Sequence, residues 1–269
     1  MYSRENHQTW QRLYERMEDE WARYANRQFL AGLDQLQFDQ AAVPRLEDVN
    51  RFLEPLTGFK ALAVSGYIPA FNFFDCLSRR EFPTTVTIRP GDSLAYLPEP
   101  DIFHDIAGHV PMHTDPAFAE TLVQFGSLAH RAARRASELP NVEQRVTQLS
   151  NVIKALSRFF WFSIEFGLMT VGDDLKAYGS GLLSSFGELE LAIESPGVQR
   201  YPFQVERVIN QTFEVDSHQP LLFTVDSFDQ LFELVEELGE WMLAGRLDDV
   251  APGEPDVRPE DIESFLERD

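Results

Sequence analysis

Cysteine is almost missing from this chain of 269 residues. Cys76 is its one thiol, which excludes an intramolecular disulfide and a metal site built from several thiolates. No apolar run approaches the ~20 residues that cross a bilayer, and the first residues lack the apolar core of a secretory signal. We therefore expect a cytoplasmic protein that does not act at a membrane.

Basic residues are also scarce. The chain has 23 Lys and Arg against 44 Asp and Glu, a formal net charge of -21, which argues against nucleic acid and anionic membrane surfaces as partners. Residues 224–269 carry much of this charge, with 15 acidic and 3 basic side chains, and we interpret them as a solvated surface. With 43% hydrophobic residues the chain can bury a large core, so we expect one domain over residues 1–246 and a loosely packed acidic tail over 247–269.

Hydrophobic periodicity predicts a mainly α fold with a few short β-strands. Residues 63–100 are rich in proline and are expected to be mostly loop. The tail is expected to hold one helical turn near Ile262. The predicted helices cover residues 10–24, 48–56, 142–169, a segment that begins at Thr114-Asp115-Pro116 and a segment capped by Ser227, and the predicted strands cover residues 84–88 and 221–225.

Two histidines and a carboxylate stand out from the apolar segments around them. His104 and His109 are five residues apart, and Glu165 follows a long predicted helix. Two imidazoles and one carboxylate on one face of a metal are typical of non-heme Fe(II) oxygenases. Positions i and i+5 of an α-helix lie about 140° apart, so we expect the helix to end near His109, where Gly108 and Pro111 favour a stop.

A competing pair is His109 and His113, which have the i,i+4 spacing of a helical metal site. Pro111 lies between them and lacks a backbone N–H, so we reject this pair. Glu165 is the stronger indication, because its neighbours Phe159 to Phe162 and Phe166 are almost all aromatic and an unpaired carboxylate there would be costly. A metal ion or an arginine must compensate its charge.

Several motifs then occur together in one order. They include Leu53-Glu54-Pro55-Leu56-Thr57-Gly58, Gly66-Tyr67-Ile68-Pro69, Pro98-Glu99-Pro100-Asp101, the two-histidine segment, the Glu165 segment and the run from Ala177 to Glu188. From about Leu53 to Phe228 the chain resembles the pterin-dependent aromatic amino acid hydroxylases, in their compact bacterial form. The resemblance implies a single hydroxylase catalytic domain, within residues 1–246, around a central metal site.

The resemblance also implies a role for particular residues. His104, His109 and Glu165 would bind Fe(II). Arg89 would hold the substrate carboxylate, with Asp101 orienting it, and a planar guanidinium suits that task. The remaining substrate-binding residues would be Pro100, Trp161, Ser184 and Ser185, with Ser184 also supporting His104, and the pterin would contact Gly66, Tyr67, Ile68, Phe73 and Asp105.

The implied activity is hydroxylation of a free aromatic amino acid by O2 with Fe(II) and tetrahydrobiopterin or a related tetrahydropterin. The indole of Trp161 would narrow the pocket, so we expect L-phenylalanine to be converted to L-tyrosine by a monomer or homodimer. The alternatives are tryptophan 5-hydroxylation or phenylalanine 3-hydroxylation within the same family. A zinc hydrolase is disfavoured because no general base is placed as in His-Glu-x-x-His, and a non-catalytic binding protein because all three ligands are kept.

Overall fold

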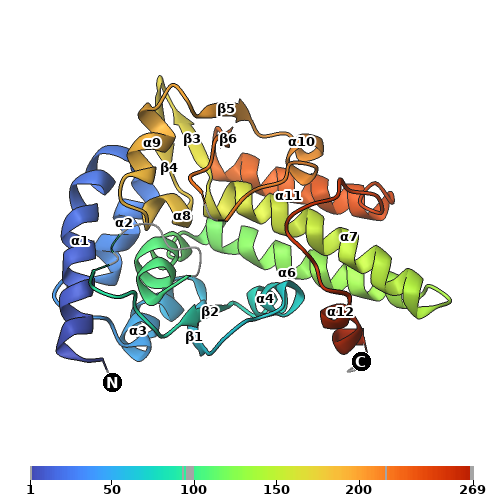
Figure 1. The fold of residues 1–269 in the computed structure, drawn as a ribbon, viewed down its shortest axis with the longest axis horizontal. Coiled ribbons are helices and arrows are strands. Elements are labelled where there is room, and N and C mark those ends of the chain that lie inside the picture. The colour runs from blue at the N-terminus through green and yellow to red at the C-terminus, as the bar shows by residue number, and fades with distance from the viewer. Residues whose placement is uncertain (1, 93, 95–99, 216, 267–269) are drawn as a thin grey trace.

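Helices dominate the computed structural model, which describes residues 2–92, 94, 100–215 and 217–266 (Figure 1). The predicted fold class is confirmed. Pro98 and Glu99 of the sequence motif lie outside the described residues. The helices are α1 (Arg4–Tyr24), α2 (Arg27–Leu36), α3 (Leu46–Thr57), α4 (Ala70–Ser78), the π-helical η1 (Phe103–His109), α5 (Val110–His113), α6 (Pro116–Ser137), α7 (Val142–Phe160), the π-helical η2 (Trp161–Glu165), α8 (Ser180–Leu183), α9 (Glu188–Glu194), α10 (Val205–Ile209), α11 (Phe228–Leu243) and α12 (Pro259–Leu266).

Two small sheets complete the described part of the fold. Parallel strands β1 (Lys60–Val64) and β2 (Glu81–Thr85) form one of them. The other has the order β4-β3-β6-β5 and consists of β3 (Leu168–Val171), β4 (Asp174–Ala177), β5 (Gln199–Pro202) and β6 (Leu221–Val225). Because β3 begins three residues after η2 ends, pairing of β3 with β4 and β6 fixes the position of that π-helical segment.

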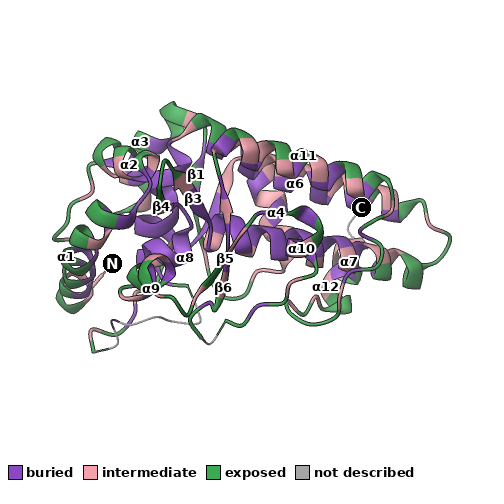
Figure 2. Ribbon diagram, turned by 90° about the horizontal axis from the view of Figure 1, so that it is seen from above, coloured by how far each residue is buried: buried purple, intermediate pink, exposed green. Residues whose placement is uncertain are grey.

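Polar side chains start the helices where the sequence predicts them. Asp115 accepts hydrogen bonds from the backbone N–H of Ala117 and Phe118 and caps α6, and Ser227 accepts from Gln230 and caps α11. Helices α6, α7 and α11 then run side by side, with their buried faces turned toward one another (Figures 1 and 2). This packed unit supports α7, the helix that runs into η2.

The sequence-based boundaries need several corrections. The helix predicted over residues 142–169 ends at Glu165, because Leu168 and Met169 pair with β4 and β6 instead. The strand predicted over 84–88 lies at 81–85, where it pairs with β1. Helix α4 lies inside the predicted loop region, and α2, α8, α9, α10, β1, β3, β4 and β5 were not predicted. Apart from α2, the elements missed outside the loop region have only four to seven residues, and so few residues carry little periodic signal.

The division of the chain at residue 246 stays a prediction. Within the predicted tail, the helix expected near Ile262 is confirmed as α12. It is not loosely packed, because Ile262 is only 1% exposed and α12 contacts α7. Along the described residues, no helix combines the length and apolar character needed to span a membrane.

Candidate metal centre

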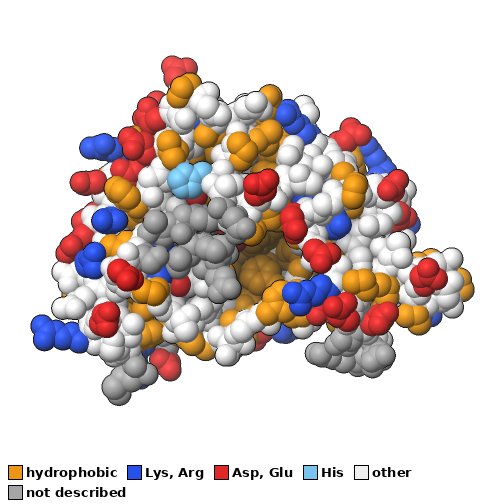
Figure 3. Space-filling view, in the orientation of Figure 1, with side chains coloured by type: hydrophobic (Ala, Val, Ile, Leu, Met, Phe, Trp, Pro, Cys, Tyr) orange, Lys and Arg blue, Asp and Glu red, His pale blue; other side chains and the backbone are white. Residues whose placement is uncertain are grey.

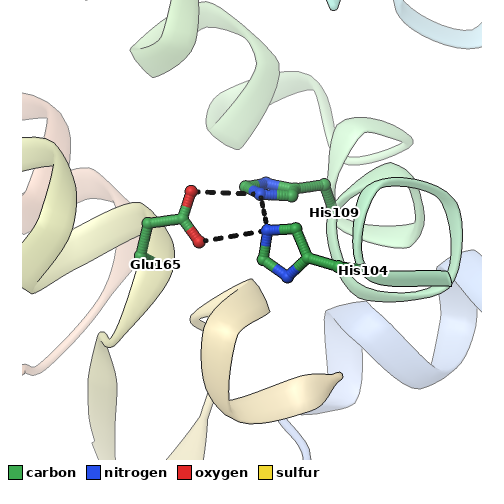
Figure 4. A group of neighbouring side chains, drawn as sticks. All are labelled: His104, His109 and Glu165. Atoms are coloured by element: carbon green, nitrogen blue, oxygen red, sulfur yellow. Dashed lines mark hydrogen bonds and ion pairs between the residues drawn. The ribbon is translucent and has the colours of Figure 1, made fainter. Parts of the chain in front are cut away.

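Glu165 meets His104 and His109 in the interior of the fold (Figure 4). The histidines come from η1 and the glutamate is the last residue of η2. The two Nε2 atoms are 3.2 Å apart, Glu165 Oε1 is 3.1 Å from His109 Nε2, and Glu165 Oε2 is 3.5 Å from His104 Nε2. Three ligand atoms therefore point at one small volume, as a bound metal ion requires.

The histidines meet by a route that the sequence did not predict. The helix does not stop near His109; it continues through η1 into the short helix α5, which includes Pro111 and ends at His113. The turns of η1 are wider than α-helical turns, because a π-helix closes its hydrogen bonds at i→i+5. Residues five apart then return to one face. His113 is fully buried, but lies outside the cluster of three ligand atoms.

The Glu165 segment also contains a π-helical turn. The backbone N–H of Phe166 donates to the carbonyl of Trp161 five residues earlier, at 2.9 Å. This wide turn carries Glu165 from the end of α7 toward the histidines. Single π-helical turns inside helices are often found at functional sites.

A chain of hydrogen bonds sets the tautomer of His104. The hydroxyl of Ser184 donates its proton to the carbonyl of Ser180 at 2.8 Å, so toward His104 it can only accept. His104 Nδ1 lies 2.8 Å from the Ser184 oxygen and must therefore carry the hydrogen. This leaves the Nε2 lone pair directed at the cluster, which is the state that binds a metal.

The protonation states of the cluster also favour a cation. Burial lowers the pKa of His104 to about 4, so this imidazole is neutral near pH 7. Burial alone would raise the pKa of Glu165, but His109, His104 and the Ser180 hydroxyl outweigh it and bring this pKa to about 2. A neutral imidazole and an ionised carboxylate are the forms that bind a divalent metal, so the donor set fits iron.

Ser180 is a member of this site that sequence reasoning missed. Its hydroxyl oxygen is 2.9 Å from Glu165 Oε2 and 2.8 Å from His109 Nε2. The sequence signal was the pair of glycines around it, Gly179 and Gly181. In the structure, a Cβ at Gly179 would lie 2.4 Å from the carbonyl oxygen of Glu165, so that glycine admits the protein's own backbone and brings Ser180 against the carboxylate.

Arg89 and Asp101 form a buried ion pair beside the cluster. Arg89 donates from Nε and Nη2 to the two carboxylate oxygens of Asp101, both at 2.8 Å. Burial alone would raise the pKa of Asp101, but Arg89 holds it below its ordinary value. Asp101 also accepts from the backbone N–H of His104 at 3.0 Å, so one carboxylate aligns the arginine and the start of the histidine segment.

The indole of Trp161 is held on two sides. It stacks on Phe213 with ring centroids 4.1 Å apart, and its Nε1–H donates to Gln219 Oε1 at 3.2 Å. Gln219 is itself buried, and its backbone N–H donates to Glu188 Oε1 at 3.0 Å. Sequence reasoning missed Gln219, because a lone glutamine 58 positions from Trp161 gives no local signal.

Aromatic rings line the other side of the cluster. The ring centroids of Phe82 and His109 are 4.7 Å apart, and Phe73 contacts Phe82 edge to face with ring centroids 6.0 Å apart. A hollow with a hydrophobic floor opens near the centre of the face in Figure 3, and charged side chains stand at its rim. Aromatic rings beside polar groups suit a flat ligand, so the rings next to His109 fit an aromatic cofactor or substrate.

The other predicted residues differ in their placement. Ser185 is buried, whereas Pro100 is exposed. Asp105 is buried with its carboxylate on the backbone N–H of Thr85 at 2.6 Å, and burial raises its pKa to about 7. The residues predicted to contact the pterin, Gly66, Tyr67 and Ile68, lie in the loop between β1 and α4, with Gly66 at φ +80° and the Tyr67 side chain exposed.

Comparison with known proteins agrees with this geometry. The family model described as biopterin-dependent aromatic amino acid hydroxylase matches residues 1–243. The phenylalanine-4-hydroxylase of Caulobacter vibrioides is 38% identical over 233 residues, which cover 87% of this chain and 74% of that protein.

Two solved structures are similar as well. Phenylalanine hydroxylase from Chromobacterium violaceum, solved with iron(III) and 7,8-dihydrobiopterin bound, has a TM-score of 0.80 at 34% identity, covering 96% of this chain and 88% of its own. The apo structure of the cold-active phenylalanine hydroxylase from Colwellia psychrerythraea has a TM-score of 0.81 at 28% identity, covering 96% of this chain and 94% of its own.

Alanine in place of His104, His109 or Glu165 should abolish iron binding. Each change removes one of three donor atoms, so the loss of affinity should exceed the ~10–100-fold that changes to supporting residues cost. Fe(II) titration calorimetry and iron content after dialysis measure it, and circular dichroism checks that the fold is kept. A variant that retains full iron affinity would show that its residue is not a ligand.

Ser180→Ala should weaken iron binding roughly 10- to 100-fold without unfolding the protein, because Glu165 loses the hydroxyl that orients one of its oxygens. Ser163→Ala is the matched control, since that buried hydroxyl donates to the backbone carbonyl of Phe159. The measurement is the Fe(II) dissociation constant of both variants. Equal affinity of Ser180→Ala and the unchanged protein would contradict the role of the hydroxyl.

Proposed function

The chain belongs to the biopterin-dependent aromatic amino acid hydroxylases, and we propose from this premise that it converts free L-phenylalanine to L-tyrosine with O2. The observation that carries the proposal is the buried set of two imidazoles and one carboxylate within a fold and sequence shared with phenylalanine hydroxylases. The cytoplasmic location and the monomeric or homodimeric state stay predictions.

Iron and a tetrahydropterin are the proposed cofactors. Together they supply the electrons and activate O2, so that one oxygen atom enters the aromatic ring. His104, His109 and Glu165 would hold the iron. Phe73 would stack on the pterin, and Gly66, Tyr67, Ile68 and Asp105 would contact it, in keeping with the aromatic lining next to His109.

The protein's own contribution is to hold the substrate in place. Arg89 would bind the substrate carboxylate, and its ion pair with Asp101 fixes the guanidinium plane before the substrate arrives. Trp161 would form a wall against the substrate ring, and its contacts with Phe213 and Gln219 fix the orientation of its indole. Pro100, Ser184 and Ser185 complete the proposed substrate site, and Ser184 also holds the ring of His104.

The apolar surroundings serve the chemistry in a second way. Phe82 lies against His109, and Phe162 and Ile164 are buried within the Glu165 segment. Such walls keep bulk water from the metal and from the reacting ring. Exclusion of water strengthens the electrostatic contacts within the site and prevents side reactions.

Arg89→Lys should raise the KM for the amino acid roughly 10- to 150-fold, since the planar fork and its charged hydrogen bonds, worth about 1.5–3 kcal/mol, are lost while the charge is kept. Iron content should stay normal. Arg51→Lys, at an exposed ion pair with Asp48, is the control. An unchanged KM in Arg89→Lys would mean that another group binds the carboxylate.

Product analysis with equal L-phenylalanine and L-tryptophan, Fe(II), O2 and tetrahydrobiopterin tests the reaction itself. We expect para-hydroxylated phenylalanine as the main product and a higher kcat/KM for phenylalanine, because the indole of Trp161 narrows the pocket. Trp161→Phe should reduce this ratio by enlarging the pocket. A preference for tryptophan, or meta-tyrosine as the main product, would overturn the substrate assignment and leave the metal site intact.

A further inference from the structure

The C-terminal segment lies beyond the residues that the family model matches, yet it is anchored deep in the fold. Arg158 of α7 is fully buried, and its guanidinium donates to the backbone carbonyls of Pro252, Gly253 and Glu254 at 3.3, 3.1 and 2.7 Å. Three carbonyls on one cation fix the path of this segment. The same helix α7 leads directly into Glu165, so the segment is tied to the element that carries a metal ligand.

From this anchor the chain reaches α12, which packs on two helices. Its Ile262 is buried, and α12 contacts α7. Its Phe265 lies against Phe71 of α4, with ring centroids 3.7 Å apart. Figure 1 shows α12 beside α4 at the lower edge of the molecule, on the side where the chain ends. Phe71 is the second residue of α4, directly after the loop that contains Gly66, Tyr67 and Ile68.

Polar contacts connect α12 to that loop as well. The Tyr67 hydroxyl donates to Asp261 Oδ2 at 3.1 Å, and the guanidinium of Arg258 lies 4.9 Å from the centroid of the Tyr67 ring. Tyr67 is 65% exposed, and these two contacts hold its side chain against α12 and the residue before it. The loop is short, and Gly66 at φ +80° adopts the left-handed conformation that favours glycine.

We propose that α12, together with Arg258 just before it, is a positioning element for the pterin: Asp261, Arg258 and Phe265 hold the loop of residues 65–69 and the first turn of α4 in the conformation that receives the cofactor. This rests on the proposed function, which assigns the pterin to this loop. A loop that is ordered before binding does not lose that freedom when the ligand arrives, so its affinity is higher. If α12 were released, the loop would have to become ordered when the pterin binds, and the affinity for the pterin would fall.

The experiment uses the full-length, iron-loaded protein with 7,8-dihydrobiopterin as the probe, titrated by calorimetry. Asp261→Ala and Phe265→Ala should each raise its Kd roughly 5- to 30-fold, the range that one or two lost contacts produce. Asp261→Asn should bind as the unchanged protein does, because its amide oxygen still accepts from Tyr67. Glu260→Ala removes an exposed charge from the neighbouring position of the same helix and serves as the control.

Three further readouts separate positioning from a merely structural role. The KM for tetrahydrobiopterin should rise in Asp261→Ala while the iron affinity and the KM for phenylalanine stay unchanged. Amide hydrogen exchange of residues 65–71 should become faster in Asp261→Ala. In a cycle with Tyr67→Phe, the second substitution should add little to the Kd, since both remove one hydrogen bond.

The outcomes distinguish this inference from the function on which it rests. If the unchanged protein neither binds dihydrobiopterin nor hydroxylates phenylalanine, the proposed function fails. If it does both, while Asp261→Ala and Phe265→Ala bind the pterin equally well and only lose thermal stability, then α12 is a structural cover and the inference is wrong.

Discussion

A carboxylate taken largely out of water, in an aromatic stretch of the chain, is the constraint on which this fold depends. An isolated charge at Glu165 would be strongly disfavoured. Two imidazoles and a hydroxyl from the surrounding chain contact the carboxylate and stabilise its charge. Each of these partners requires its own local structure. The histidines need a widened helical turn, and Ser180 needs glycines that admit backbone next to Glu165. The same enclosure that makes the charge costly also makes it a strong metal ligand.

Contacts on either side of the cluster are linked to it by single residues. Asp101 accepts from Arg89 and from the backbone of His104, so the group proposed to hold the substrate and the first metal ligand share one carboxylate. On the other side, Phe82 joins His109 to Phe73. Helix α7 joins both Glu165 and, through Arg158, the C-terminal segment. A disturbance at the surface of the protein can therefore change how the centre is arranged.

Much of the centre could be predicted from the sequence, because its residues are chemically conspicuous. Two histidines in an apolar run and a glutamate among aromatics stand out wherever the chain places them. The route by which the histidines meet could not be predicted, since a π-helical turn depends on tertiary packing and not on the identity of the residues in it. Ser180 and Gln219 were missed for a similar reason: their partners lie 15 and 58 positions away. Capping residues such as Asp115 and Ser227 act locally, and the helices that they start were predicted correctly.

The widened turn between the histidines also preserves the rotational phase of everything that follows it. Without one of the residues between them the histidines would have i,i+4 spacing, which shares a face of an ordinary α-helix. Both spacings bring the chain round by about one turn, because a π-helical turn takes one residue more than an α-helical one. The extra residue therefore leaves the buried Met112 and His113 of α5 on the side that faces the core. In an ordinary α-helical stretch, one added residue would instead rotate all later side chains by about 100° about the helix axis.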